Sequence, residues 1–262
     1  MNIFIKVWDQ PFKFPALIIP AVVATFLATG CGQQMQAVCP DVPERVVLVP
    51  STSASDLATS QDLGPAVAAQ AVARAANSCG RISVGLQNNA VESDLELLSL
   101  ELTPKRTMAF NAKPVIKPLI KEAEAFVQDT LLGPLATIPP TNGSPFINGL
   151  IKMATELNAH GGVPATIILL GDGIAIERTP SGGLVDFRTT DVPKALLDEF
   201  VPLLAPLKAS CVMLVSAGAE SDLTDETLRN GQKLLGDTLN EAGIGFVATR
   251  SRDVPTSCPA IP

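Results

Sequence analysis

The sequence of 262 residues is poor in aromatic side chains and in histidine. It contains no Tyr, one Trp, one His and ten Phe. Trp8 and four of the Phe lie within the first 30 residues, which leaves six Phe as the only aromatic side chains of the remaining chain. Proteins that bind sugars or nucleic-acid bases stack them on aromatic rings, so this composition argues against both classes.

Basic side chains are also too few for a polyanion partner. The chain has 19 Lys and Arg against 26 Asp and Glu, a net charge of −7, so we expect no nucleic-acid partner. His160, the only histidine, excludes histidine-clustered metal sites. It follows a predicted helix and precedes a predicted strand, which places it at the opposite sheet edge from the loops after the strands. We interpret it as a residue that binds helix carbonyls, with no catalytic role.

The N-terminus has the features of an export signal. Two lysines, Lys6 and Lys13, precede an apolar run from Phe14 to Leu27, which is short for a membrane span. The following small residues lead to Cys31, and the segment from Leu27 to Cys31 resembles the lipobox of bacterial lipoproteins. That resemblance implies cleavage before Cys31 and a diacylglycerol on its thiol. An uncleaved anchor or an ordinary secretory signal is the alternative.

This N-terminus predicts three segments: a lipoprotein signal peptide (1–30), a lipid-anchored tether (31–44) and one folded domain (45–262). Four cysteines follow Cys31, and an even number in an exported chain favours disulfides over a metal site. Three pairings are open, and we favour a bond between the two cysteines that flank the domain, Cys39 and Cys258. The disulfide candidates are Cys39, Cys79, Cys211 and Cys258.

Apolar strand-like runs alternate with helical patterns from residue 45 onward. The patterns predict strands over 45–50, 81–87, 94–102, 165–170, 210–215 and 244–249. They predict helices over 56–77, 115–132, 145–159, 192–204 and 222–242. Residues 174–188 predict an additional hairpin, and 94–102 an antiparallel edge strand. The fold expected is α/β, a single doubly wound, mostly parallel six-stranded sheet with helices on both faces.

Ligands of such sheets bind beyond the carboxyl ends of the strands, so the loops there are the candidate site. Ser51, Ser53 and Ser55 follow the first strand, Ser144 precedes a helix, and Gly-Asp172-Gly follows the strand 165–170. These loops resemble the metal-ion-dependent adhesion site of the von Willebrand factor type A domain. The resemblance implies that one divalent cation is held by Ser53, Ser55, Ser144 and Asp172, with Ser51 at the position of the family's leading Asp.

The replacement of this leading Asp by Ser51 removes a carboxylate that Mg²⁺ favours. Asp56, one residue past the motif, could compensate in part. We therefore expect a metal-free remnant of the site, with one bound Mg²⁺ or Mn²⁺ as the alternative. A further alternative is a purely structural role, in which these serines and Asp56 only cap the helix that follows them.

The sequence predicts a protein-binding domain with no enzymatic activity. We expect it to lie outside the cytoplasm in the cell envelope, lipid-anchored to a bacterial membrane, and to bind an envelope or extracellular protein for adhesion or assembly. One alternative is an envelope hydrolase or phosphatase that uses Asp172. The other is a small-molecule-binding lipoprotein. The predicted hairpin follows Asp172 directly, so it should lie beside the site and shape its selectivity.

Overall fold

The fold is known from a computed structural model that describes residue 39 and residues 43–86, 95–102, 116–141, 145–159, 164–189, 192–215 and 223–259. The chain divides into two units, Met1–Gln36 and Ala37–Pro262, and every described residue belongs to the second. Cys31, Ser144 and His160 lie outside the described residues. None of the described helices is both long enough and apolar enough to cross a membrane.

A six-stranded sheet forms the centre of the unit, with the strand order β3-β2-β1-β4-β7-β8. All neighbouring strands pair in parallel except β2 and β3, which are antiparallel. The strands are β1 (Arg45–Pro50), β2 (Arg81–Val84), β3 (Leu98–Glu101), β4 (Ala165–Leu170), β7 (Cys211–Val215) and β8 (Gly245–Thr249). The chain thus has the doubly wound α/β fold that its sequence predicted.

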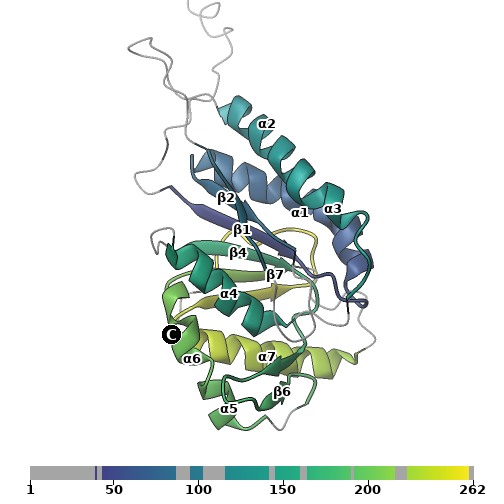
Figure 1. Ribbon diagram of the computed structural model, residues 1–262, viewed down its shortest axis with the longest axis vertical. Helices are drawn as coiled ribbons and strands as arrows, with labels where there is room; N and C mark the ends of the chain where they lie inside the picture. Colours follow the sequence, from purple (N-terminus) through teal and green to yellow (C-terminus); the bar gives the residue numbers. More distant parts are fainter. Residues whose placement is uncertain are drawn as a thin grey trace, which may run out of the picture. The chain divides into compact units, whose positions relative to one another are not determined.

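Helices cover both faces of this sheet (Figure 1). One face packs on α1 (Leu57–Asn77), α2 (Ile116–Val127) and the turns that extend α2, η2 (Gln128–Leu132) and α3 (Gly133–Leu135). The other face packs on α4 (Phe146–Ala159), α6 (Val201–Leu204), η3 (Ala205–Leu207) and α7 (Asp225–Glu241), with α5 (Lys194–Asp198) beside α6. The hairpin of β5 (Ile176–Arg178) and β6 (Leu184–Asp186) forms a separate two-stranded sheet.

The continuous apolar runs of β1 and β4 are explained by burial on both sides. Every residue of both strands is buried, and successive side chains of a strand point to opposite faces. Val46 and Leu48 lie in the core under α1 and α2, whereas Val47 and Val49 lie in the core under α4 and α7. The two strands therefore hold the centre of the sheet between two apolar layers.

The predicted elements are all present, with shorter ends in several. Strands β1 and β4 have the predicted bounds, and β3 is the antiparallel edge strand expected within 94–102. The helix expected over 192–204 is interrupted between Asp198 and Val201, where Pro202 follows as the second residue of α6. Proline lacks an N–H and cannot continue an α-helical hydrogen-bond ladder, so the break has a local cause.

The cysteines pair differently from the flank-to-flank bond that we favoured. Cys39 bonds Cys79, and Cys211 bonds Cys258. Cys79 lies two residues before β2 and Cys211 begins β7, so both disulfides lie at the amino-end edge of the parallel strands. Sequence position was misleading because each terminal segment returns to this edge beside a different strand. A Cβ at Gly245, the first residue of β8, would lie 2.8 Å from the Cβ of Cys258.

Candidate functional site

The loops after β1 and β4 meet at the carboxyl-end edge of the sheet. Pro50 and Leu170, the last residues of these neighbouring parallel strands, are partners in the register. The backbone N–H of Ser51 donates to the carbonyl oxygen of Leu170 at 2.8 Å. The serines of the first loop and Asp172 of the second are therefore neighbours, as the sequence predicted. We call this edge, defined by residues 51–56 and 171–173, the rim.

Asp56 lies at the centre of the rim and joins its two loops. The hydroxyls of Ser51 and Ser53 both donate to Asp56 Oδ2 at 2.8 Å, and the backbone N–H of Asp172 donates to Asp56 Oδ1 at 3.1 Å. Asp56 is only 8% exposed, and burial raises the pKa of its carboxyl against the opposing effect of these hydrogen bonds. Both carboxylate oxygens thus accept hydrogen bonds within the rim.

Glycine lets the β4 loop approach Asp56. Gly171 has φ +146°, and a Cβ at this position would lie 3.0 Å from Asp56 Oδ2 and 3.0 Å from Ser51 Cβ. Gly173 has φ +71°, and its Cβ would lie 2.5 Å from a methyl carbon of Leu214 in β7. The Gly-Asp-Gly motif is therefore needed for the backbone path as well as for its carboxylate.

The Asp172 carboxylate braces its own loop. The side-chain oxygen Oδ1 of Asp172 accepts a hydrogen bond from the backbone N–H of Ile174 at 2.9 Å. The backbone carbonyl oxygen of Asp172 accepts one from Gln232 Nε2 of α7 at 3.1 Å. The side chain of Asp172, a ligand position according to the resemblance, is buried. Ser55, by contrast, is exposed, with its hydroxyl 3.1 Å from that of Ser53.

A third loop reaches the rim through Thr141. Its backbone N–H donates to the carbonyl oxygen of Thr52 at 2.8 Å, its carbonyl oxygen accepts from the N–H of Ala54 at 3.0 Å, and its hydroxyl lies 3.2 Å from that of Thr52. We had expected Ser144 to supply this hydroxyl, but Ser144 lies outside the described residues. Thr141 was missed because it stands inside a turn-rich stretch and belongs to no motif.

The rim as arranged does not fit a divalent cation in the manner that the resemblance implies. The hydroxyls of Ser51 and Ser53 use their protons on Asp56, and the leading carboxylate is absent at Ser51. Mg²⁺ requires about six oxygen ligands near 2.1 Å and favours carboxylates, and both oxygens of the Asp56 carboxylate already accept hydrogen bonds. In the described part of the chain, no group of three or more His, Cys, Asp or Glu side chains is placed to hold a metal ion.

The hairpin is attached beside the rim by a buried carboxylate that the sequence analysis missed. Glu177 of β5 is fully buried. Its Oε1 accepts the backbone N–H of Ile147 at 2.8 Å, and its Oε2 accepts the backbone N–H and the Nδ2 of Asn148 at 3.2 and 2.7 Å. These N–H groups begin α4, where the helix dipole favours an anion. Burial raises the pKa of Glu177 to about 7.

The other face of the hairpin carries exposed apolar side chains. Glu177 and Val185 form an inward pair in the register, which turns their neighbours outward. Ile176 and Leu184 are 43% and 61% exposed; in the register, the exposed Arg178 is the partner of Leu184, and Asp186 is the partner of Ile176. The alternation predicted for residues 174–188 thus buries a charge and exposes two large aliphatic side chains.

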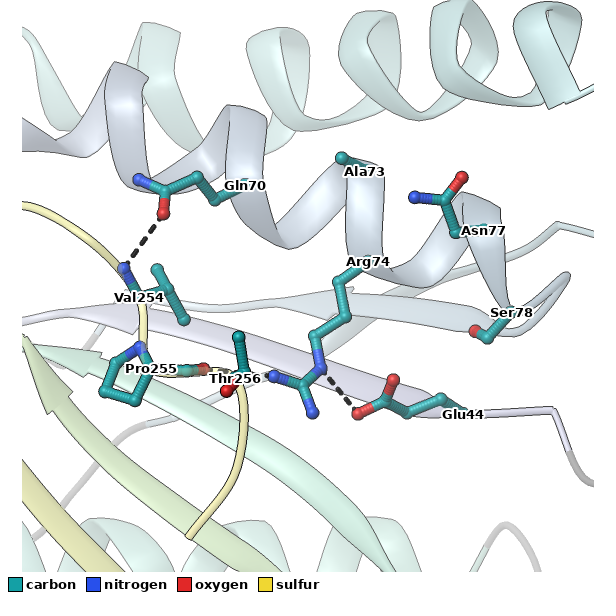
Figure 2. Close-up of a pocket in the computed structure, with 9 residues that line it drawn as sticks. All are labelled: Glu44, Gln70, Ala73, Arg74, Asn77, Ser78, Val254, Pro255 and Thr256. Atoms are coloured by element: carbon teal, nitrogen blue, oxygen red, sulfur yellow. Dashed lines mark hydrogen bonds and ion pairs between the residues drawn. The ribbon is translucent and has the colours of Figure 1, made fainter. Parts of the chain in front are cut away.

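An open pocket of about 700 Å³ lies at the opposite edge of the sheet, between α1 and the C-terminal segment (Figure 2). Several of its polar groups are paired with one another. Arg74 Nε donates to Glu44 Oε1 at 2.6 Å, Arg74 Nη1 donates to the carbonyl oxygen of Pro255 at 3.2 Å, and the N–H of Val254 donates to Gln70 Oε1 at 2.9 Å. These bonds hold the C-terminal segment on α1, so we assign the pocket a structural role.

No protein-family model matches the sequence, and no curated protein sequence matches it. Among solved structures, the chain is similar to a von Willebrand factor type A protein from Catenulispora acidiphila, at 12% identity and a TM-score of 0.42, over 80% of this chain and 39% of that chain. It is similar to the pilus adhesin SpaC from Lactobacillus rhamnosus GG, at 15% identity and a TM-score of 0.41, over 82% of this chain and 29% of that one.

It is also similar to the human COPII-coat protein Sec24c, at 9% identity and a TM-score of 0.43, over 79% of this chain and 29% of that one. The chain spans well under half the length of these three structures.

Proposed function

We propose that this chain is a lipid-anchored, non-enzymatic protein-binding domain outside the cytoplasm, which holds its partner on the hairpin beside the rim. The two exposed aliphatic side chains of the hairpin, Ile176 and Leu184, carry this proposal. Exposed aliphatic side chains gathered on one small element favour contact with another protein. Because Glu177 fixes the inner face of the hairpin to α4, the outer face is presented on a rigid support.

The position of the disulfides supports an orientation for this domain. Cys39 is bonded to Cys79 at the amino-end edge of the sheet, whereas the rim and the hairpin follow the carboxyl ends of β1 and β4. A lipid on Cys31 would therefore connect to the domain at the edge opposite the rim. The rim and the hairpin would then be free to meet a partner that approaches from outside.

The same disulfides support a location in an oxidising compartment. Two bonds that use all four cysteines after Cys31 are typical of exported proteins, because cytosolic thiols are kept reduced. Replacement of Cys31 by Ser should release the chain from the membrane fraction. An unchanged membrane fraction would mean that the apolar N-terminal run is itself the anchor.

The arrangement at the rim supports binding over hydrolysis. A hydrolase needs a nucleophile or general base aimed at the substrate. The Asp56 carboxylate accepts three hydrogen bonds within the rim, and Asp172 Oδ1 accepts one from the backbone of its own loop. Hydrolysis of generic ester or phosphate substrates that is lost on Asp172→Ala would contradict this part of the proposal.

The test measures protein binding after substitution of exposed aliphatic side chains on the hairpin, Ile176 and Leu184, and of one away from it, Leu98. Envelope proteins of the source cell are captured on the wild-type chain, on the Ile176→Asp, Leu184→Asp double variant, and on Leu98→Asp. Leu98, 45% exposed on edge strand β3, is the control for a charge placed on an exposed apolar site away from the hairpin. We expect one protein to bind wild type and Leu98→Asp, and to lose at least tenfold in affinity for the double variant. Equal binding to all three would refute the hairpin as the partner site.

A further inference from the structure

Two features of the rim indicate how its two loops are connected: which groups donate hydrogen bonds to Asp56, and the position of Asp56 at the N-terminus of a helix. In the arrangement that the resemblance implies, serine hydroxyls present oxygen lone pairs to a central cation. In this chain the hydroxyls of Ser51 and Ser53 present their protons to Asp56 Oδ2. These two hydroxyls and the backbone N–H of Asp172 thus surround the Asp56 carboxylate with three donors, which stabilise its negative charge.

The helix that follows the rim adds to this preference. Asp56 directly precedes α1, a helix of 21 residues. The N-terminus of a helix carries a partial positive charge, which stabilises a carboxylate and repels a cation. Asp56 makes no side-chain cap bond within α1, and its carboxylate is directed to Ser51, Ser53 and the N–H of Asp172 instead.

We infer that the Asp56 carboxylate replaces the cation in this chain, and that it ties the β1 and β4 loops together without a divalent metal. One carboxylate joins two hydroxyls of the first loop to a backbone N–H of the second, a connection that a cation would otherwise make between oxygens. Gly171 makes room for it, since a side chain there would meet Asp56 Oδ2 at 3.0 Å. A cation bound by the Asp56 carboxylate would have to compete with these three donors.

This inference has a consequence for the partner, which rests on the proposed function. A cation at the rim would attract an acidic side chain of the partner. A buried carboxylate attracts none, and Asp172 adds a second acidic group. The partner segment at the rim is therefore expected to be uncharged or apolar, in keeping with the exposed Ile176 and Leu184.

The test needs no partner, so it stands or fails separately from the proposed function. The full-length chain in detergent is titrated with Mn²⁺ up to 1 mM, and free Mn²⁺ is measured by electron paramagnetic resonance. Thermal midpoints are measured in 5 mM MgCl₂ and in chelator. We expect no stoichiometric binding and equal midpoints for wild type. One bound Mn²⁺ per chain that is lost on Asp56→Ala would overturn the inference.

The tie between the loops is tested by the same melts. Asp56→Ala should lower the midpoint by roughly 5 °C, equally with Mg²⁺ and with chelator, because three hydrogen bonds to one buried carboxylate are lost. Asp62→Ala is the control, since Asp62 lies on the same helix and is exposed. An unchanged midpoint for Asp56→Ala would overturn the inference. If that variant does not fold, the Mn²⁺ titration of wild type still decides.

Discussion

Replacement of Glu177 by Gln should remove most of a pH dependence from the stability of the domain. Glu177 of β5 is fully buried against the first residues of α4, and burial raises its pKa from 4.5 to about 7. The folded protein therefore binds this proton more tightly than the unfolded chain does. Its stabilising contribution is fully present below pH 4.5 and is lost as the pH rises through 7.

The size of the effect follows from the two pKa values. A change from 4.5 to about 7 corresponds to roughly 3 kcal/mol of unfolding free energy, most of which falls between pH 5 and pH 8. Wild type should be more stable at pH 5 than at pH 8 by roughly 2 to 3 kcal/mol from this group. The raised pKa of Asp56 acts in the same direction, so Glu177→Gln should retain a smaller difference.

The assay is urea unfolding at pH 5 and at pH 8, with the unfolding free energy obtained by linear extrapolation. Glu177→Gln keeps the size of the side chain, but its amide places N–H donors against the N–H groups of Ile147 or Asn148, so it should be less stable at both pH values. Glu124→Gln, on the exposed face of α2, is the control and should leave the wild-type difference unchanged. A wild type that is more stable at pH 8, or a Glu177→Gln that keeps the full difference, would refute the role of Glu177.

Three further substitutions test the packing. Gly173→Ala should cost about 1 to 3 kcal/mol of unfolding free energy in urea, because φ is +71° and the new methyl would meet Leu214. Cys211→Ser should cost roughly 4 kcal/mol in the same assay, since the bond to Cys258 closes a loop with a sequence separation of 47. Leu150→Ala should cost roughly 2 to 5 kcal/mol, because this α4 side chain is fully buried in the core under the sheet.

Each of these three has a matched comparison. Gly182→Ala has a positive φ of 90° but no neighbour within 4 Å of the new methyl, so it should cost less than Gly173→Ala. Dithiothreitol should lower wild-type stability more than that of Cys211→Ser, which retains only the Cys39–Cys79 bond. Leu203→Ala, at an exposed leucine, should cost under 1 kcal/mol. Equal costs within any pair would contradict the packing described.

Much of the fold could be predicted from local patterns. The strands β1 and β4 are uniformly apolar because both of their faces are buried, and a run of this kind has clear ends. The alternation within 94–102 likewise predicted an edge strand, and the short connection to the preceding strand predicted its antiparallel pairing. The position of Asp172 after β4 also predicted its place at the rim, because parallel strands end at the same edge.

The disulfide pairing and the two buried carboxylates could not be predicted in this way. Cys258 approaches Cys211 only because the segment after β8 returns to the start of β7. Glu177 faces inward although alternation would place the apolar Ile176 inward instead, and the helix end that Glu177 binds is 30 residues away. Asp56 was expected to be a helix cap or an auxiliary ligand, and its bond to the N–H of Asp172 spans 116 residues.

The sequence alone thus determined the succession of strands and helices along the chain, the six-stranded α/β class and the loops in which a site would form. These features depend on periodicity and on the direction of parallel strands. It also predicted an exported, lipid-anchored chain, which remains to be tested. Only the tertiary structure decided which groups meet within those loops. Ser51, Ser53 and Asp172 converge on Asp56 because β1 and β4 pair in register.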